Sequence, residues 1–305
     1  MAAEREVTFE SDGLRLVGSF LAPAGLGPFA AVLMLPGSGQ IDRDDNASKL
    51  RIDAFPQIAT YLTLHGFASF RFDKRGVGAS EGDYWTAGFA DRVTDATAAL
   101  SWLRSQGDVD PDRVFVLGHS EGALIATRLA GVPVPMAGAI LLAGTAHSGE
   151  ETLIWQAQRI ARGLRGLNKW LIGALHIDVA KSQRKALDKI KRTDRDWVRV
   201  RLVQKINAKW MREFLAYDPS DDLSRLRVPV LAITGSKDIQ VDPDDLKIMA
   251  RLVRSDFESH EIPDLTHILR ADAHEPSLAN YKQQIAMPVD PRVLELVGDW
   301  LERKS

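Results

Sequence analysis

The sequence predicts an α/β fold: a doubly wound, mainly parallel sheet of eight strands, with a helical lid inserted between two of them. Short apolar runs alternate with helical patterns along most of the chain. Most of these runs are continuous, as is typical of parallel strands that are covered on both faces. A long segment near the middle interrupts this alternation before it resumes.

The expected elements begin with an antiparallel hairpin. Residues 5–9 and 14–22 read as two strands joined by a turn at Ser11-Asp12-Gly13. Further apolar runs predict strands over residues 30–35, 68–72, 114–117, 139–143, 228–234 and 257–262. Helical patterns between and after them predict helices over residues 55–65, 89–105, 123–130 and 292–302.

The interruption divides the chain into a core, residues 1–148 and 218–305, and a lid, residues 149–217. The lid reads as helical throughout, and residues 158–212 carry 16 Lys and Arg against four Asp. A long insertion between strands suits a cover over an active site, and its basic charge could steer anionic substrates or touch anionic membranes. The alternative is a solvated helical face. The segment holds four of the seven tryptophans, which could pin it to the core or support a homodimer: Trp155, Trp170, Trp197 and Trp210.

Composition narrows the function classes. The 305 residues can bury one large core, and the absence of cysteine excludes disulfides, thiolate catalysis and cysteine-ligated metals. A net charge of −2 gives no reason to expect nucleic-acid binding. No apolar run approaches the roughly 18 to 20 residues of a membrane span. The N-terminus does not read as a secretory signal, so a cytoplasmic location is expected.

The most informative motif is Gly118-His119-Ser120-Glu121-Gly122. It follows an apolar run and precedes a helix-forming stretch, so it describes a strand that turns sharply into a helix with Ser120 at the apex. Such a turn strains the serine backbone and leaves no room for side chains two residues before or after it. The helix N-terminus favours negative charge beside the serine. We therefore expect Ser120 to be a nucleophile.

A nucleophilic serine needs a base, and the base needs an orienting acid. Asp238 follows the strand at 228–234 and His267 follows the strand at 257–262, which places both at the carboxyl edge of the sheet. The chain order Ser120, Asp238, His267 is the order expected for this kind of turn. His274 stays open as a rival base and Asp242 as a rival acid.

The oxyanion of the reaction would need two backbone N–H groups. One is expected from Glu121, directly after the nucleophile, and the other from the loop Pro36-Gly37-Ser38-Gly39-Gln40. The amide of Ser38 is the expected donor, with Gly39 or Gln40 next, and a plain glycine turn is the alternative. The charged stretch 73–80 reads as a tight turn held by ion pairs near the site, a scaffold without a chemical role.

Together these motifs resemble the α/β-hydrolase superfamily. Within it, Gly37-Ser38-Gly39-Gln40-Ile41-Asp42-Arg43-Asp44 resembles the loop of bacterial esterases related to serine aminopeptidases and monoacylglycerol lipases. The resemblance implies Ser120 as nucleophile, His267 as base and Asp238 as acid, a small-molecule acyl substrate, and neither a cofactor nor a metal. Many relatives have His-Gly where this chain has Pro36-Gly37.

The expected function is ester hydrolysis through an acyl-enzyme by a carboxylesterase-like serine hydrolase. A peptidase, amidase or thioesterase could use the same triad, and a non-catalytic binding module on this fold is a further alternative. An apolar pocket under the lid tryptophans would favour an esterase, whereas acidic residues in the pocket would favour an aminopeptidase.

Overall fold

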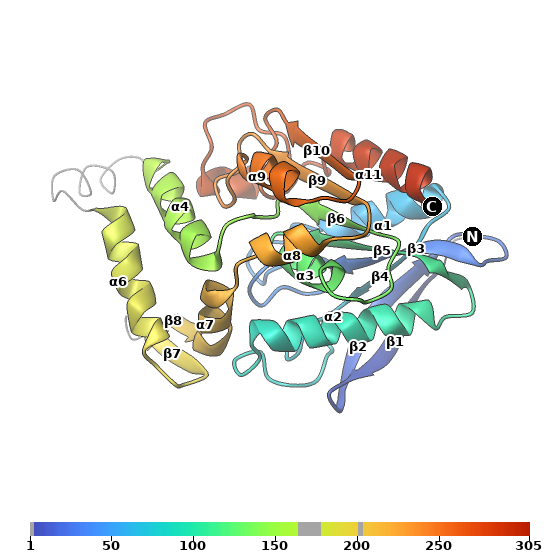
Figure 1. Cartoon of the computed structure of the whole chain (residues 1–305), viewed down its shortest axis with the longest axis horizontal. Helices are drawn as coiled ribbons and strands as arrows, with labels where there is room; N and C mark the ends of the chain where they lie inside the picture. The colour runs from blue at the N-terminus through green and yellow to red at the C-terminus, as the bar shows by residue number, and fades with distance from the viewer. Residues whose placement is uncertain (1–2, 164–177, 201–203) are drawn as a thin grey trace.

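An eight-stranded sheet forms the centre of the computed structural model, which describes residues 3–163, 178–200 and 204–305 (Figure 1). The strand order is β1-β2-β4-β3-β5-β6-β9-β10. Neighbouring strands from β4 to β10 are parallel, whereas β2 is antiparallel to both β1 and β4. The mainly parallel sheet predicted from the sequence is therefore confirmed. The strands are β1 (Ala3–Ser11), β2 (Leu14–Ala22), β3 (Phe29–Leu35), β4 (Ala68–Phe72), β5 (Val109–His119), β6 (Gly138–Leu142), β9 (Val230–Gly235) and β10 (Phe257–Ile262).

Helices cover both faces of the sheet, which explains why its central strands read as continuous apolar runs. Strands β4, β6 and β9 are buried at every residue. One face packs against α1 (Ala54–Leu64) and α11 (Pro291–Lys304), and the short α10 (Tyr281–Gln284) joins this layer. The other face packs against α2 (Phe89–Arg104), α3 (Glu121–Ala130), α8 (Ser220–Arg225) and α9 (Asp245–Leu252). No helix in the described ranges is both long and apolar enough to cross a membrane.

The N-terminal hairpin has the turn that its sequence predicts. Ser11 pairs with Leu14 across β1 and β2, so Asp12 and Gly13 are the two turn residues. Both have positive φ angles, 47° at Asp12 and 74° at Gly13. Positive φ at both central positions is the geometry of a type I′ turn, for which Asp-Gly is a preferred pair.

The segment between β6 and β9 stands at one end of the sheet (Figure 1). Ahead of α8, the helices described in this segment are α4 (Gly149–Arg162), α6 (Val179–Lys191) and α7 (Ala208–Ala216). The expectation of helix throughout is wrong, because β7 (Trp197–Val200) and β8 (Gln204–Asn207) form an antiparallel pair. The run Trp197-Val198-Arg199-Val200 alternates β-branched with other residues, a pattern that favours extended backbone. Trp170 lies outside the described residues.

Candidate active site

The predicted site residues follow the carboxyl ends of neighbouring parallel strands. The loop of Ser38 follows β3, Ser120 follows β5, Asp238 follows β9 and His267 follows β10. Since parallel strands end at the same edge of the sheet, the topology brings these loops to one side of the core.

Ser120 occupies a sharp turn between β5 and α3. Its φ and ψ angles are 55° and −115°, a region that a residue with a side chain rarely adopts. The turn is held by a hydrogen bond from the Ser120 N–H to the Leu142 carbonyl at 2.9 Å. A Cβ at Gly118 would overlap the backbone of Gly122, and one at Gly122 would overlap the Leu35 carbonyl. Both glycines are therefore required by close backbone approach.

Asp238 and His267 form a buried pair beside this turn. Asp238 Oδ2 lies 2.7 Å from His267 Nδ1, and their residues are 0% and 5% exposed. The other oxygen, Asp238 Oδ1, accepts the N–H groups of Gln240 at 2.7 Å and Val241 at 2.9 Å. These contacts fix the carboxylate and aim one oxygen at the imidazole. Within the described residues, Ser120 Oγ has no hydrogen bond to His267.

The rivals that the sequence left open lie apart from this pair. Asp242 Oδ1 accepts the N–H of Asp244 at 3.1 Å. His274 Nδ1 lies 2.8 Å from Asp272 Oδ1, and 77% of its side chain is exposed. In the part of the chain that the structure describes, neither rival bonds to Asp238 or His267.

His119, the residue before Ser120, connects the turn to the loop of His267. Its Nε2 donates to the His267 carbonyl at 2.8 Å, and the two rings are 5.0 Å apart. Its Nδ1 lies 2.7 Å from Asp45 Oδ2, an ion-pair distance at which the two atoms are not aligned as a hydrogen bond. Burial lowers the pKa of the His119 imidazole, but Asp45, the His267 carbonyl and Asp238 together outweigh burial, so the pKa is raised. The sequence interpretation missed Asp45.

The loop after β3 borders Ser120. A Cβ at Gly37 would lie 3.5 Å from Ser120 Cβ, and the Gly37 N–H donates to Asp45 Oδ1 at 2.9 Å. Ser38 and Ser120 line a common cavity of about 60 Å³. The other lining residues are mixed polar and apolar; α4 and α7 contribute the apolar Leu153, Trp210 and Phe214. This loop thus reaches the space beside the serine hydroxyl.

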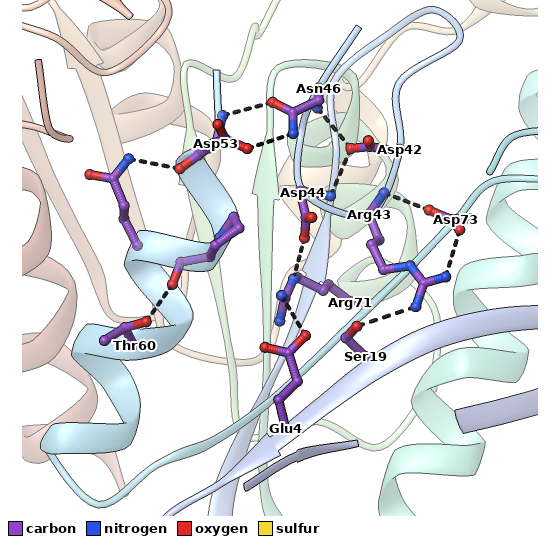
Figure 2. A network of polar contacts seen from close by, with 12 residues as sticks. Glu4, Ser19, Asp42, Arg43, Asp44, Asn46, Asp53, Thr60, Arg71 and Asp73 are labelled. Atoms are coloured by element: carbon purple, nitrogen blue, oxygen red, sulfur yellow. Dashed lines mark hydrogen bonds and ion pairs between the residues drawn. The ribbon is translucent and has the colours of Figure 1, made fainter. Parts of the chain in front are cut away.

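Ion pairs and hydrogen bonds hold the segment that carries Asp45 (Figure 2). Asp42 Oδ1 accepts the N–H groups of Asp44 and Asn46 at 2.9 and 3.0 Å. Arg43 reaches Asp73 at 2.8 Å, and Arg71 Nε donates to Asp44 Oδ1 at 2.7 Å. Asp45 itself is fully buried, with a positive φ of 66°. The network therefore fixes the backbone on both sides of Asp45.

The stretch 73–80 is the ion-paired turn that the sequence predicts. Asp73 Oδ2 accepts the Ala79 N–H at 3.0 Å, and Arg75 Nε donates to Asp95 Oδ2 at 2.7 Å. Lys74 differs from these neighbours, because its ammonium is buried and donates to the Gly37 carbonyl beside Ser120. The sequence shows that Lys74 is a charged residue after a buried strand, but it does not show that Lys74 contacts the Gly37 carbonyl.

A second cavity, of about 330 Å³, adjoins the first and shares Thr145 and Thr152 with it. His147 and Asp245 lie in its wall as a hydrogen-bonded pair, with His147 Nδ1 2.5 Å from Asp245 Oδ1. Burial raises the pKa of Asp245, and the Thr145 hydroxyl and His147 offset only part of that rise. Among the described residues, no group of three or more His, Asp and Glu is placed to hold a metal ion.

Comparisons with known proteins agree with this architecture. A model of the family described as serine aminopeptidase, S33, matches residues 51–274. Esterase EstD of Thermotoga maritima is 27% identical over 300 residues, which span 98% of this chain and 67% of EstD. An uncharacterized protein of Mycobacterium tuberculosis is 36% identical over 131 residues, or 43% of this chain and 42% of that protein.

The fold is that of the α/β hydrolases. The crystal structure of the alpha/beta hydrolase GrgF from Penicillium sp. sh18 superposes with a TM-score of 0.66 at 18% identity. The superposition covers 99% of each chain, so the insertion between β6 and β9 lies within the compared length.

Proposed function

This chain belongs to the serine aminopeptidase S33 family, and we propose that it is a carboxylesterase-like serine hydrolase. Its substrate is a small-molecule carboxylic ester, cleaved through an acyl-enzyme on Ser120. One observation carries the proposal: Ser120 sits on a strained strand-to-helix turn, and an aspartate-histidine pair follows the ends of neighbouring strands. The similarity to esterase EstD supports the choice of an ester as substrate.

In the first half of the proposed reaction, Ser120 Oγ attacks the ester carbonyl while His267 Nε2 takes the hydroxyl proton. Asp238 holds His267 in the tautomer with a proton on Nδ1 and stabilises the imidazolium that forms. The backbone N–H groups of Ser38 and Glu121 donate to the oxyanion. A serine-histidine hydrogen bond is often long in a free enzyme and tightens when substrate binds.

In the second half, His267 gives its proton to the leaving alcohol, and the acyl group remains on Ser120. Water then attacks the acyl-enzyme carbonyl while His267 takes a proton from it; the bond from Ser120 Oγ to the acyl carbon breaks, His267 returns the proton to Ser120 Oγ, and the carboxylic acid leaves. Glu121 contributes its backbone N–H, because its carboxylate is already held by Arg92 and Trp210.

The lining of the cavity beside Ser120 favours esters over peptides with a charged amino terminus. Leu124, Leu153 and Phe214 are apolar, and among the described residues that line this cavity Glu121 is the one acidic residue. The Glu121 carboxylate is neutralised by Arg92, whose Nη1 lies 2.5 Å from both of its oxygens. Among the lining residues that the structure describes, an ammonium group would find no free acidic partner in this cavity.

We also propose that residues 149–217 act as a lid. Helix α4 contributes Thr152, Leu153 and Gln156 to the cavity beside Ser120, and α7 contributes Trp210 and Phe214. A lid of this kind selects the acyl group, because its side chains form part of the wall that the substrate must fit.

The test is hydrolysis of p-nitrophenyl esters of increasing acyl length by the wild type and by Ser120→Ala. Turnover that peaks at one length and is lost in the variant supports the proposal. A fluorophosphonate probe reports on Ser120 independently of the substrate. Labelling without ester turnover would point to amides or thioesters as substrates. A folded wild type that shows no labelling and no turnover would contradict the proposal of a serine hydrolase.

A further inference from the structure

Lys74 is a buried cation with three partners around the candidate active site. Its side chain is 6% exposed and belongs to the turn that follows β4. The ammonium donates to the Gly37 carbonyl and lies 3.4 Å from the Gly39 carbonyl. It also lies 3.3 Å from Glu121 Oε2. One charge therefore joins the loop after β3 to the first residue of α3.

These contacts have a direct effect on the N–H groups of the loop. The Gly37 carbonyl and the Ser38 N–H belong to the same planar, trans peptide unit, so they point in opposite directions. A cation that binds the carbonyl fixes the orientation of this unit and directs the Ser38 N–H away from Lys74. It also polarises the amide, because hydrogen bonds in a chain strengthen one another.

Asp45 fixes the preceding peptide unit. The Gly37 N–H donates to Asp45 Oδ1 at 2.9 Å, while the Gly37 carbonyl accepts from Lys74. Gly37 is therefore held on both sides, by a carboxylate at its N–H and by an ammonium at its carbonyl. Ser38, the next residue, is exposed and lines the cavity beside Ser120.

We propose that Lys74 is a positioning residue for the oxyanion hole: it orients and polarises the Ser38 amide through Gly37 and anchors Glu121 through its carboxylate. The inference rests on the proposed function, in which the N–H groups of Ser38 and Glu121 bind the oxyanion. Lys74 does not touch the substrate. It acts through Ser38 and Glu121, whose N–H groups donate to the oxyanion.

The charges around Lys74 also favour negative charge beside Ser120. Glu121, from α3, contacts both Lys74 and Arg92 from α2, so these three side chains carry one surplus positive charge. Asp45, which also faces Lys74, is paired with His119. A preorganised positive charge in a dry site stabilises an oxyanion more than it would in water.

The protonation of Lys74 gives the inference a measurable signature. Burial lowers the pKa of Lys74, Glu121 and Asp45 offset part of this change, Arg92 adds to it, and the resulting pKa is about 8. The ammonium therefore loses its proton as the pH rises through about 8. We expect kcat of the wild type to fall over the same range, because the neutral amine no longer polarises the Gly37 peptide.

The experiment compares Lys74→Met and Lys74→Arg with a matched control, Lys282→Met, which removes an exposed lysine from α10. Steady-state hydrolysis of a p-nitrophenyl ester is measured from about pH 6 to pH 10. We expect Lys74→Met to lower kcat about 10- to 100-fold, less than the roughly 100- to 1,000-fold loss of a whole oxyanion donor. KM should change by less than about twofold, and the decline above pH 8 should disappear.

Lys74→Arg stays charged over the whole range and should retain more activity above pH 9 than Lys74→Met. If Lys74→Met has the same kcat as the wild type and the same decline above pH 8, the inference is overturned and the proposed function is left intact. If Lys74→Met does not fold, a wild-type kcat that stays flat between pH 7.5 and 10 would overturn it as well. A wild type with neither turnover nor fluorophosphonate labelling would instead contradict the proposed function.

Discussion

The contacts of Asp238 predict a large and specific effect of the substitution Asp238→Asn. Asp238 Oδ1 accepts two backbone N–H groups, from Gln240 and Val241, so an asparagine must keep its carbonyl oxygen on that side. Its NH₂ group then faces His267 Nδ1, which in the wild type lies 2.7 Å from Asp238 Oδ2. A donor at this position turns Nδ1 into an acceptor and moves the imidazole proton to Nε2.

An Nε2 atom that carries a proton cannot take the proton of Ser120. The loss of a correctly oriented histidine tautomer lowers kcat by about 10⁴-fold in serine proteases that use the same arrangement. At about 1.36 kcal/mol for each factor of ten, this corresponds to a barrier about 5.4 kcal/mol higher. The shape of the side chain is unchanged, so we expect the free energy of unfolding to fall by about 1 to 3 kcal/mol, the contribution of one charged hydrogen bond.

The assay is p-nitrophenyl ester hydrolysis with urea unfolding on the same preparations. Asp242→Asn is the matched control, because Asp242 lies in the same loop and does not bond to His267. A folded Asp238→Asn variant with kcat within about tenfold of wild type would refute the reasoning. A loss of the same size in Asp242→Asn would assign the acid to the rival residue.

Three further predictions concern stability. Gly122→Ala places a Cβ against the Leu35 carbonyl, whereas a Cβ at Gly107 meets nothing within 4 Å. In urea unfolding, Gly122→Ala should lower the free energy of unfolding by more than about 2 kcal/mol, and the control Gly107→Ala should change it little. Glu121→Ala leaves Lys74 and Arg92 buried without their carboxylate, so it should lower the free energy of unfolding by about 3 to 5 kcal/mol. Glu121→Gln removes the charge and keeps a hydrogen-bonding side chain; it should lower the free energy of unfolding as much only if the charge is decisive. The pKa of Lys74 is about 8 in the folded chain, below its ordinary 10.5. The unfolded chain therefore binds more protons between these values, and the contribution of Lys74 to stability rises with pH in this window. Thermal unfolding at pH 8 and pH 10 should show stability rising more in the wild type than in Lys74→Met; an equal change in both would contradict the depressed pKa.

Elements whose cause is local could be predicted from the sequence. The continuous apolar runs of β3 and β6 indicate strands, because a strand covered on both faces has few positions for polar side chains. Asp12 and Gly13 indicate the hairpin turn, and the glycines around Ser120 indicate the strand-to-helix turn, because each depends on backbone conformations that few residues adopt. The hairpin of β7 and β8 was missed, since its strands are four residues each within a segment otherwise rich in helix formers.

The sequence alone thus determined the fold class, the strained serine, and the strand ends after which Asp238 and His267 lie. The tertiary structure decided which side chains meet there. Lys74 reaches Gly37 and Glu121 across 37 and 47 residues of chain, and Asp45 reaches His119 from a separate loop. Local sequence patterns indicate secondary-structure propensity and burial, because both depend on residues that are close along the chain. Contacts between distant charged residues depend on strand order and on the packing of loops, and these are set only when the whole sheet has formed.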